Sequence, residues 1–193
     1  MPETNHPRYE FKIANLAHER LGVNRLLYKT FVREIPRYQD PGIDSLVDKF
    51  DERNIYVIAV HQTRVCGMMA VHDGPDFSVA GAIDSPSRLA QLRKPLLEAR
   101  IFAVAPEHRF GVVFAGLASH VFRYARNEGY ANIVMTGLAS RQEMYRRMGF
   151  RSLGPAVLRG EEYFVPMSLE LREVPKAIRA DLSRWEQRLA RST

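Results

Sequence analysis

The chain carries near its centre an apolar run, Leu96-Leu97-Glu98-Ala99-Arg100-Ile101-Phe102-Ala103-Val104, followed at once by the turn Ala105-Pro106-Glu107-His108-Arg109-Phe110-Gly111. The run predicts a buried strand, and the wide apolar stripe after Gly111 predicts a long amphipathic helix. Backbone N–H groups and the helix dipole both favour an anion at a helix N-terminus. A basic, glycine-containing turn at this place is therefore suited to bind a phosphate-bearing ligand.

A second strand is predicted at residues 132–136, and the short helix after it ends in Tyr145-Arg146-Arg147-Met148-Gly149-Phe150. The tyrosine lies where this helix can direct it into the same cleft as the turn. Before the central run, apolar spacing predicts a strand at 8–13, a helix at about 19–35 that Pro36 ends, and an antiparallel pair of strands at 54–60 and 65–71. The other segments are predicted as a surface loop at 74–86, a short helix near 88–92, a connector at 151–160, a strand at 162–171 and a tail helix at 174–189.

This order of elements predicts an α/β fold in which helices flank a mixed sheet. With 46% hydrophobic residues in 193, the chain can bury a substantial core. We expect residues 1–171 to form one domain and residues 172–193 to be a C-terminal helical extension of the same domain.

The single cysteine, Cys66, can form neither an intramolecular disulfide nor a zinc cluster, which fits a reducing, cytoplasmic setting. We expect Cys66 to be a small buried core residue. No run of about 18 apolar residues and no charged-then-apolar leader is present, so we expect neither a membrane span nor a signal peptide.

The net charge of +6 and the pI near 9.7 favour an acidic partner or substrate. The basic residues are scattered through the predicted helices and are not interleaved with aromatic residues in one stripe, so no nucleic-acid partner is expected. A phosphorylated cofactor, an acidic carrier protein and a lipid surface all remain compatible with this charge.

The order of elements and the motifs resemble the GNAT superfamily of acyl-CoA-dependent N-acyltransferases over residues 8–171. The cofactor loop of that superfamily reads Gln/Arg-x-x-Gly-x-Gly/Ala, and the matching frame here, His108-Arg109-Phe110-Gly111-Val112-Val113, keeps the first glycine. Its last helix often ends in Tyr-x-x-x-Gly-Phe, which residues 145–150 match.

Within the superfamily, the chain is most similar to the N-acyl amino acid synthases and the acyl-homoserine-lactone synthases. This similarity rests on Tyr9-Glu10-Phe11-Lys12-Ile13-Ala14, Leu27-Tyr28-Lys29-Thr30-Phe31, Glu98-Ala99-Arg100-Ile101-Phe102 and Leu153-Gly154-Pro155. The resemblance implies a long acyl chain as the transferred group, often delivered by an acyl carrier protein.

Acyl transfer from a thioester to an amine needs a polarised carbonyl and a stabilised oxyanion, and a buried amide donor is worth about 3–4 kcal/mol at such a site. The resemblance places the thioester carbonyl near the backbone N–H of Val104. It also implies that the loop takes the pyrophosphate or phosphopantetheine of the donor. The implied cofactor-binding residues are Val104, His108, Arg109, Phe110, Gly111, Val112 and Val113. We expect no metal.

Glu98 is the candidate general base. It precedes Val104 by six residues, so strand periodicity predicts that both face the same side. The resemblance implies a glutamate here that usually acts through a water. The alternative is that Glu98 pairs with Arg100 or lies at a strand edge.

Tyr145 is the candidate acid that protonates the leaving thiolate, and the alternative is a tyrosine that only packs. For the acceptor, His72 and Asp73 at the end of a strand could line the site, or could be ordinary loop positions. Arginine guanidinium groups can bind a carboxylate through two hydrogen bonds, which would suit an amino acid. The candidates for this are Arg25, Arg33 and Arg100, each of which could instead be solvated or structural.

Taken together, we expect an N-acyltransferase that moves an acyl group from acyl-CoA or an acyl-carrier-protein thioester to a primary amine such as an amino acid. Val113 and Phe114 stand where acetyl-CoA enzymes have Gly or Ala, so their bulk favours a carrier-bound phosphopantetheine, and basic charge would help to dock an acidic carrier. The alternatives are an ordinary acetyl-CoA-dependent N-acetyltransferase and a catalytically silent module that binds acyl-CoA or an amino acid.

Overall fold

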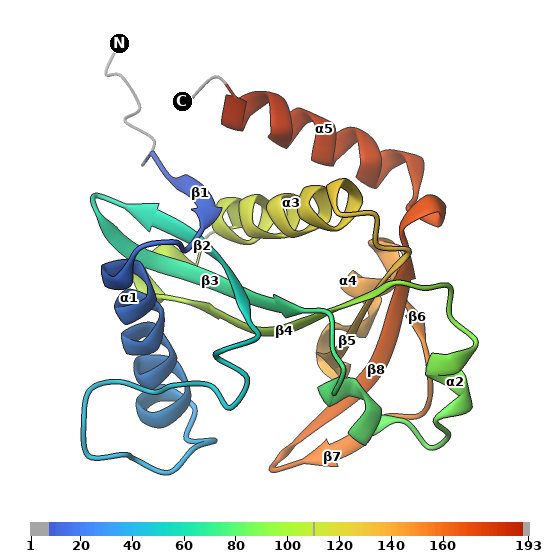
Figure 1. The fold of residues 1–193 in the computed structure, drawn as a ribbon, viewed down its shortest axis with the longest axis horizontal. Helices are drawn as coiled ribbons and strands as arrows, with labels where there is room; N and C mark the ends of the chain where they lie inside the picture. Colours follow the sequence, from blue (N-terminus) through green and yellow to red (C-terminus); the bar gives the residue numbers. More distant parts are fainter. Residues whose placement is uncertain (1–7, 110, 191–193) are drawn as a thin grey trace.

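A computed structural model describes residues 8–109 and 111–190, and in these residues the chain forms an eight-stranded mixed sheet flanked by helices (Figure 1). This confirms the predicted fold class. The strands are β1 (Glu10–Ile13), β2 (Ile55–His61), β3 (Arg64–His72), β4 (Leu96–Val104), β5 (Asn132–Leu138), β6 (Arg151–Ser152), β7 (Val157–Arg159) and β8 (Glu162–Glu170). Their order across the sheet is β1-β2-β3-β4-β5-β8-β6, and β7 pairs with β8.

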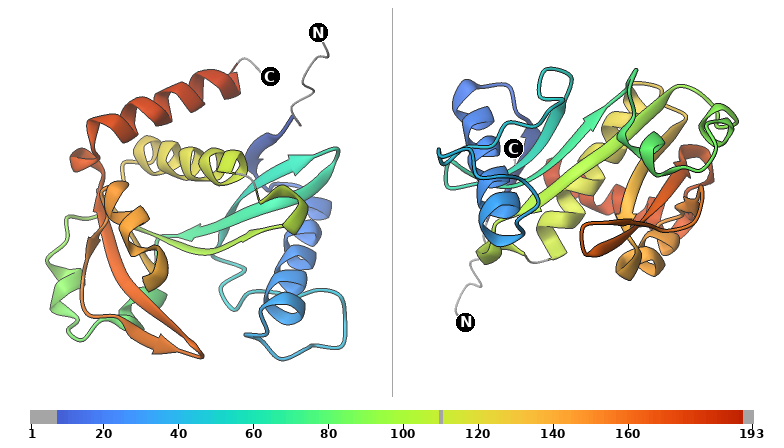
Figure 2. Two further views of the ribbon diagram at one scale, coloured as in Figure 1. Left: turned by 180° about the vertical axis from the view of Figure 1, so that it is seen from behind. Right: turned by 90° about the horizontal axis from the view of Figure 1, so that it is seen from below.

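Helices cover both faces of the sheet. The α-helices are α1 (Ala17–Tyr28), α2 (Ser87–Ala90), α3 (Gly111–Asn127), α4 (Gln142–Arg147) and α5 (Lys176–Ala190). A π-helix, η1 (Lys29–Glu34), continues α1, and short 3-10 helices form η2 (Ser78–Ala82), η3 (Pro106–His108), η4 (Ala139–Arg141) and η5 (Leu171–Glu173). Helix α1 lies on one face, whereas α3 lies on the other and is itself covered by α5 (Figures 1 and 2).

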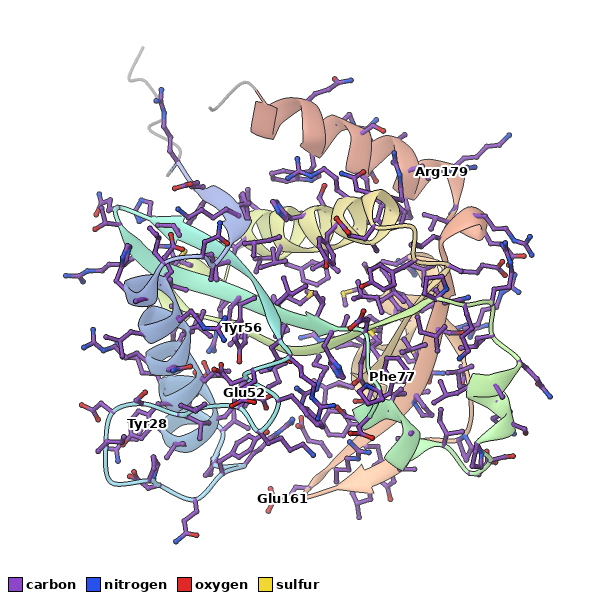
Figure 3. All side chains as sticks on the ribbon, in the orientation of Figure 1. Tyr28, Glu52, Tyr56, Phe77, Glu161 and Arg179 are labelled. Carbon is purple, nitrogen blue, oxygen red and sulfur yellow. The ribbon has the colours of Figure 1, made fainter. Side chains whose placement is uncertain are left out.

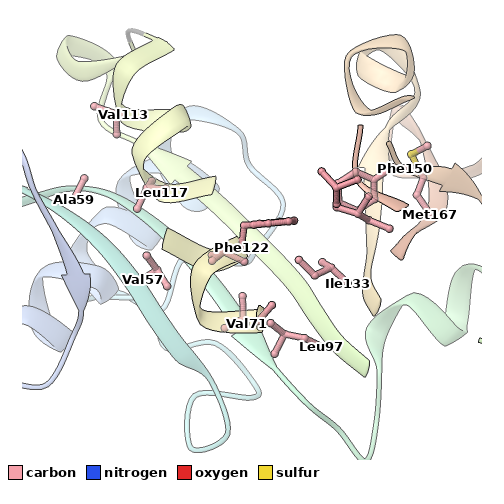
Figure 4. Packing of buried hydrophobic residues seen from close by; sticks show 14 of the residues in the cluster. Val57, Ala59, Val71, Leu97, Val113, Leu117, Phe122, Ile133, Phe150 and Met167 are labelled. Atoms are coloured by element: carbon pink, nitrogen blue, oxygen red, sulfur yellow. The ribbon is translucent and has the colours of Figure 1, made fainter. Parts of the chain in front are cut away.

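The two faces follow from alternation along the strands, because successive side chains of a strand point to opposite sides. In β2, Tyr56 and Ile58 belong to a core between the sheet and α1, which we term the α1-side core. Val57 and Ala59 belong to the α3-side core, together with Leu117 and other residues of α3 (Figure 4). This two-sided burial explains why β2 reads as a nearly continuous apolar run.

Cys66 is buried, as predicted, and burial raises the pKa of its thiol to about 11. Beside it, Gly67 lets α3 pack closely on β3, since a Cβ atom at Gly67 would lie 2.8 Å from a methyl group of Val113. Gly116 likewise lets α3 pack closely on β1, because a Cβ atom at Gly116 would overlap the ring of Phe11. Glycine is therefore required at both positions by close approach.

Strands β4 and β5 are parallel neighbours for only three residue pairs, from Leu96↔Asn132 to Glu98↔Val134. Beyond these pairs, β5 continues along β8, and β4 continues along β3. A β-bulge lies in β4. Phe102 and Ala99, which are three residues apart in β4, pair with Met69 and Val71, which are two residues apart in β3. The two central strands therefore separate after Glu98 and leave a notch in the middle of the sheet.

Three segments differ from the sequence prediction. The helix expected at 19–35 begins at Ala17 and ends as a π-helix, the loop expected at 74–86 contains η2, and the connector expected at 151–160 contains β6 and β7. The two short strands lack an apolar alternation of their own and are held by hydrogen bonds to β8. Such pairing with a distant partner leaves no signal in a local pattern.

The tail forms the helix that was expected. Ile178 and Leu182 pack against the α3-side core, while the side chain of Leu189 lies outside the described residues. No helix in the described part of the chain has the length and apolar character needed to cross a lipid bilayer.

Replacing Gly116 by alanine tests the contact between β1 and α3. Gly→Ala within a helix ordinarily stabilises it by about 1 kcal/mol. Here the new methyl group would overlap the ring of Phe11, so we expect a loss of about 1–3 kcal/mol in the free energy of unfolding. Urea denaturation measures this change.

Gly111→Ala in the same helix is the matched control, because a Cβ at Gly111 meets no atom within 4 Å. Its free energy of unfolding should equal that of the parent protein or rise by up to about 1 kcal/mol. A Gly116→Ala protein as stable as the parent would contradict the packing described here.

Candidate active site

A cavity of about 1350 Å³ occupies the notch between β4 and β5. Its walls come from both sides of the sheet. One end is polar and is lined by Ser78, Glu98 and Arg100 with Arg37 and Tyr38 from the chain after η1, whereas the other end is apolar and is lined by Val121, Phe122, Ile133, Met148, Phe150 and Leu169. Phe122 of α3 points toward Phe150 across this apolar end (Figure 4).

Glu98 is 1% exposed and is held by four hydrogen bonds. Its Oε2 accepts from His72 Nε2 at 2.8 Å, from the Ser78 N–H at 2.8 Å and from Ser78 Oγ at 3.1 Å. Its Oε1 accepts from the Val79 N–H at 2.6 Å and from no other donor among the residues that the structure describes. A carboxylate oxygen can accept two hydrogen bonds, so Oε1 retains room for one further donor.

His72 fixes this carboxylate from one side. The Gly74 N–H donates to His72 Nδ1 at 3.2 Å, so the ring hydrogen lies on Nε2, which donates to Glu98. The imidazole lies between the rings of Phe50 and Phe77, with centroid distances of 5.3 and 5.8 Å. His72 is thus buried and rigid, and among the residues described it contacts Glu98 without itself lining the cavity.

Arg100 lines the cavity but is already bound by other side chains. Its guanidinium donates to Asp48 at 2.6 Å, to Ser78 Oγ at 2.7 Å and to Asn54 at 3.3 Å. It also stacks over the ring of Phe50, 4.3 Å from the centroid. Burial acts to raise the pKa of Asp48, but the hydrogen bond and charge of Arg100, together with hydrogen bonds from Asn54 and the Phe50 N–H, lower that pKa below its usual value.

Glu98 and Val104 do not lie on the same face of β4, so that expectation from strand periodicity is wrong. The bulge between them moves the side chains that follow it to the opposite face of the sheet. Val104 packs in the α3-side core with Leu97, whereas its neighbour Ala103 packs in the α1-side core.

The backbone of Val104 nevertheless points into the notch. The Ala105 N–H donates to Cys66 on β3 at 2.8 Å, and backbone groups alternate in direction along an antiparallel strand. The Val104 N–H and C=O therefore point away from β3. The Val104 carbonyl accepts a hydrogen bond from Arg109 Nε at 3.0 Å, which agrees with this direction.

Tyr145 of α4 lines the same cavity from the side of β5. Its ring lies directly over Gly137, where a Cβ would come within 2.5 Å of it, and it meets Phe150 edge-on with centroids 6.4 Å apart. Burial raises the pKa of the Tyr145 hydroxyl, and the charge of Arg141 partly offsets this. The structure thus brings Glu98, the Val104 backbone and Tyr145 to one cavity.

The two basic side chains of the loop are engaged by protein groups. His108 Nδ1 lies 3.0 Å from the Tyr9 hydroxyl and forms no part of the cavity wall in the described chain. Arg109 lines the cavity but forms an ion pair with Glu34 of η1, at 2.5 Å. Gly111 and the backbone at the start of α3 therefore remain the groups of this loop that can meet a phosphate.

The bulky residues of the loop do not obstruct this backbone equally. Val113 is fully buried beneath α3 against Gly67, so its side chain points away from the notch. Phe114 lines the cavity and packs edge-on against Phe102 of β4, with centroids 5.5 Å apart. Val112 is half-buried against the α3-side core, and Phe110 lies outside the described residues.

Two of the arginines considered for the acceptor lie outside the cavity wall. Arg25 is exposed on α1, and Arg33 lies 3.7 Å from Asp40 and lines a separate, smaller hollow beside Pro106. Sequence reasoning missed Ser78, Asp48 and Arg37, which reach the site from a predicted loop and from irregular chain. No spacing signal could have placed them, because each depends on the tertiary fold.

Among residues 8–109 and 111–190, no group of three or more histidine, cysteine or acidic side chains could hold a metal ion.

The chain is similar to one protein family in sequence and to several solved structures in fold. A family model described as N-acyl amino acid synthase FeeM matches residues 22–169. No curated protein sequence matches. The structure of BjaI, a CoA-dependent acyl-homoserine lactone synthase with MTA, has a TM-score of 0.74 at 18% identity, covering 95% of this chain and 90% of that one.

The structure of FeeM from uncultured soil microbes has a TM-score of 0.73 at 18% identity, over 91% of this chain and 99% of that one. A protein of Desulfovibrio desulfuricans assigned to the GNAT family of acetyltransferases has a TM-score of 0.58 at 16% identity, over 85% and 99%. At these identities the structural likeness shows the fold alone, and with the family match it confirms the resemblance drawn from the sequence.

Replacing His72 by phenylalanine tests the support of Glu98. Phenylalanine keeps the stack between Phe50 and Phe77 but removes the donor to Glu98 and leaves the Gly74 N–H without its acceptor. We expect the free energy of unfolding to fall by about 1–3 kcal/mol, as measured by urea denaturation.

His72→Gln is the comparison variant, since its amide can supply both a donor and an acceptor. It should lose less stability than His72→Phe. Equal stability of His72→Phe and the parent protein would show that the hydrogen bond to Glu98 contributes nothing to folding.

Proposed function

The chain belongs to the FeeM family of N-acyl amino acid synthases, and on that premise we propose that it transfers a long acyl chain from a thioester to the α-amino group of an amino acid. The donor in this proposal is a phosphopantetheine thioester, carried either by CoA or by an acidic carrier protein. The GNAT-type fold and the family both assign the chain to the acyltransferases.

One observation carries the proposal: a single cavity runs through the notch from Glu98 to the apolar chamber at Phe122 and Phe150. Pockets for drug-sized ligands measure about 300–1,000 Å³. A volume near 1350 Å³ leaves room for an acceptor and for an acyl chain together. An acetyl group would not need the apolar chamber, so this observation supports a long acyl group over acetyl.

The residues present can perform each step of a direct transfer. Glu98 Oε1 accepts a proton from the attacking amine, directly or through a water, while the new C–N bond forms. The oxyanion that develops on the thioester carbonyl meets the Val104 N–H. The C–S bond then breaks, and the leaving thiolate takes a proton from the hydroxyl of Tyr145.

The donor would enter between the diverging strands, with its phosphates at the start of α3. Because Arg109 and His108 are bound to Glu34 and Tyr9, this loop offers mainly backbone N–H groups to a phosphate. These backbone N–H groups can bind the phosphate of a carrier-bound phosphopantetheine arm as well as the phosphates of CoA. The net charge of +6 would favour the approach of an acidic carrier protein.

The experiment is to incubate the purified protein with a pool of amino acids and with acyl-CoA donors of two to sixteen carbons. A parallel series supplies the same chains on an acyl carrier protein. Mass spectrometry then identifies N-acyl amino acids. We expect product from long donors, little from acetyl-CoA, and loss of product in Glu98→Gln.

Product formed only from acetyl-CoA would instead favour the ordinary acetyltransferase. Binding of long donors without any product, with either carrier, would favour the silent binding module.

Tyr145→Phe tests the proton donor. The ring keeps its packing on Gly137, but the thiolate must leave without a proton, so we expect kcat to fall about 10²–10⁴-fold. The Kd for the acyl thioester should stay within about twofold, since no binding contact is removed. Stopped-assay kinetics and calorimetry measure the two constants. Unchanged turnover would remove Tyr145 from the mechanism.

A further inference from the structure

Among the described residues, four arginine side chains line the cavity, and three of them are paired with acids of the protein. Arg37 pairs with Glu162, Arg100 with Asp48 and Arg109 with Glu34. Each of these guanidinium groups already has a carboxylate as its partner. A substrate carboxylate would have to displace that partner before it could bind there.

The fourth, Arg159, is the last residue of β7 and is exposed to solvent. In the part of the chain that the structure describes, no carboxylate lies within ion-pair distance of it. Glu162 faces it across the β7–β8 hairpin in the strand register, but the carboxylate of Glu162 is taken by Arg37. Arg159 therefore presents an uncommitted guanidinium to the cavity.

Arg159 and Glu98 meet the same short element from two sides. Glu98 accepts hydrogen bonds from the N–H groups of Ser78 and Val79 at the start of η2. Arg159 Nη2 lies 3.6 Å from the position that a Cβ would take on Gly81, three residues further along η2. A 3-10 helix rises about 2 Å per residue, so these two anchor points lie about 4–6 Å apart along η2.

Glu98 and Arg159 both line the cavity beside this one short element, so a small acceptor in the cavity could contact both. The amino group of an α-amino acid can lie at Glu98 while its carboxylate lies within reach of a long arginine side chain. Figure 3 shows Glu161 at the tip of the β7–β8 hairpin and Phe77, the residue before η2. Glu161 of this hairpin and Ser78 of η2 both line the cavity.

We propose that Arg159 binds the carboxylate of the acceptor, so that the β7–β8 hairpin restricts the acceptor to molecules with a free α-carboxylate. Arginine can hold a carboxylate through two parallel hydrogen bonds, which also fixes its orientation. This inference rests on the proposed acylation of an amino acid. It replaces Arg25, Arg33 and Arg100 by a residue that sequence spacing did not single out.

The test compares an amino acid with its primary amide as acceptors, at a fixed concentration of a long-chain acyl thioester. The two acceptors share the amine and differ in the carboxylate. We expect the parent protein to use the amino acid with at least a tenfold higher kcat/KM. In Arg159→Gln this ratio should fall to near one, through a higher KM for the amino acid, with the KM for the thioester unchanged.

Arg159→Lys keeps the positive charge and should restore part of the ratio. Arg126→Gln is the control, because Arg126 is exposed at the end of α3 and outside the cavity wall. Circular dichroism should show that all three variants are folded.

The outcomes separate this inference from the proposed function. If the parent protein acylates neither acceptor, the proposed function fails. If it acylates both equally, or if Arg159→Gln keeps the full preference for the amino acid, the proposed function stands and the role of Arg159 is wrong.

Discussion

The parting of β4 from β5 is the constraint on which the site depends. The two strands share three residue pairs and then follow different partners, β4 along β3 and β5 along β8. Backbone groups of β4 beyond Glu98 consequently lack a strand neighbour on one side and are free to meet a ligand. The same parting joins the two faces of the sheet through one cavity, which gives a polar end and an apolar end to a single ligand site.

A cluster of buried polar side chains holds the polar end in place. A continuous chain of hydrogen bonds joins His72, Glu98, Ser78, Arg100 and Asp48, and the side chains of His72, Glu98 and Asp48 are buried. Buried charges are costly unless they are paired and hydrogen-bonded. Here Asp48 pairs with Arg100 at 2.6 Å, and Glu98 accepts four hydrogen bonds and lies 3.9 Å from Nε of Arg100. The result is a carboxylate whose position is determined by four donors, with one accepting site left on Oε1 for chemistry.

The loop before α3 shows how tertiary contacts change the reading of a motif. Its frame has the expected place between a strand and a helix, yet Arg109 pairs with Glu34 and His108 contacts Tyr9, each on a distant element. Val113, which replaces a small residue of the usual motif, points under α3 onto Gly67. Gly67 of β3 is thus the small residue that allows Val113 to pack closely between α3 and the sheet. The loop backbone at the start of α3 remains accessible to a ligand.

Apolar spacing was enough to predict the strands and long helices of the mixed sheet, because these depend on local periodicity. The burial of Cys66 followed from the usual behaviour of a free cysteine, and Tyr145 was singled out by the motif at residues 145–150. Apolar spacing did not reveal the bulge in β4, the short strands β6 and β7, or the partners of the charged side chains. Strand periodicity wrongly placed Glu98 and Val104 on one face, since a single extra residue reverses it. Arg37, Arg100, Arg109 and Arg159 look alike in the sequence, and they differ only because folding brings acids from remote segments to three of them.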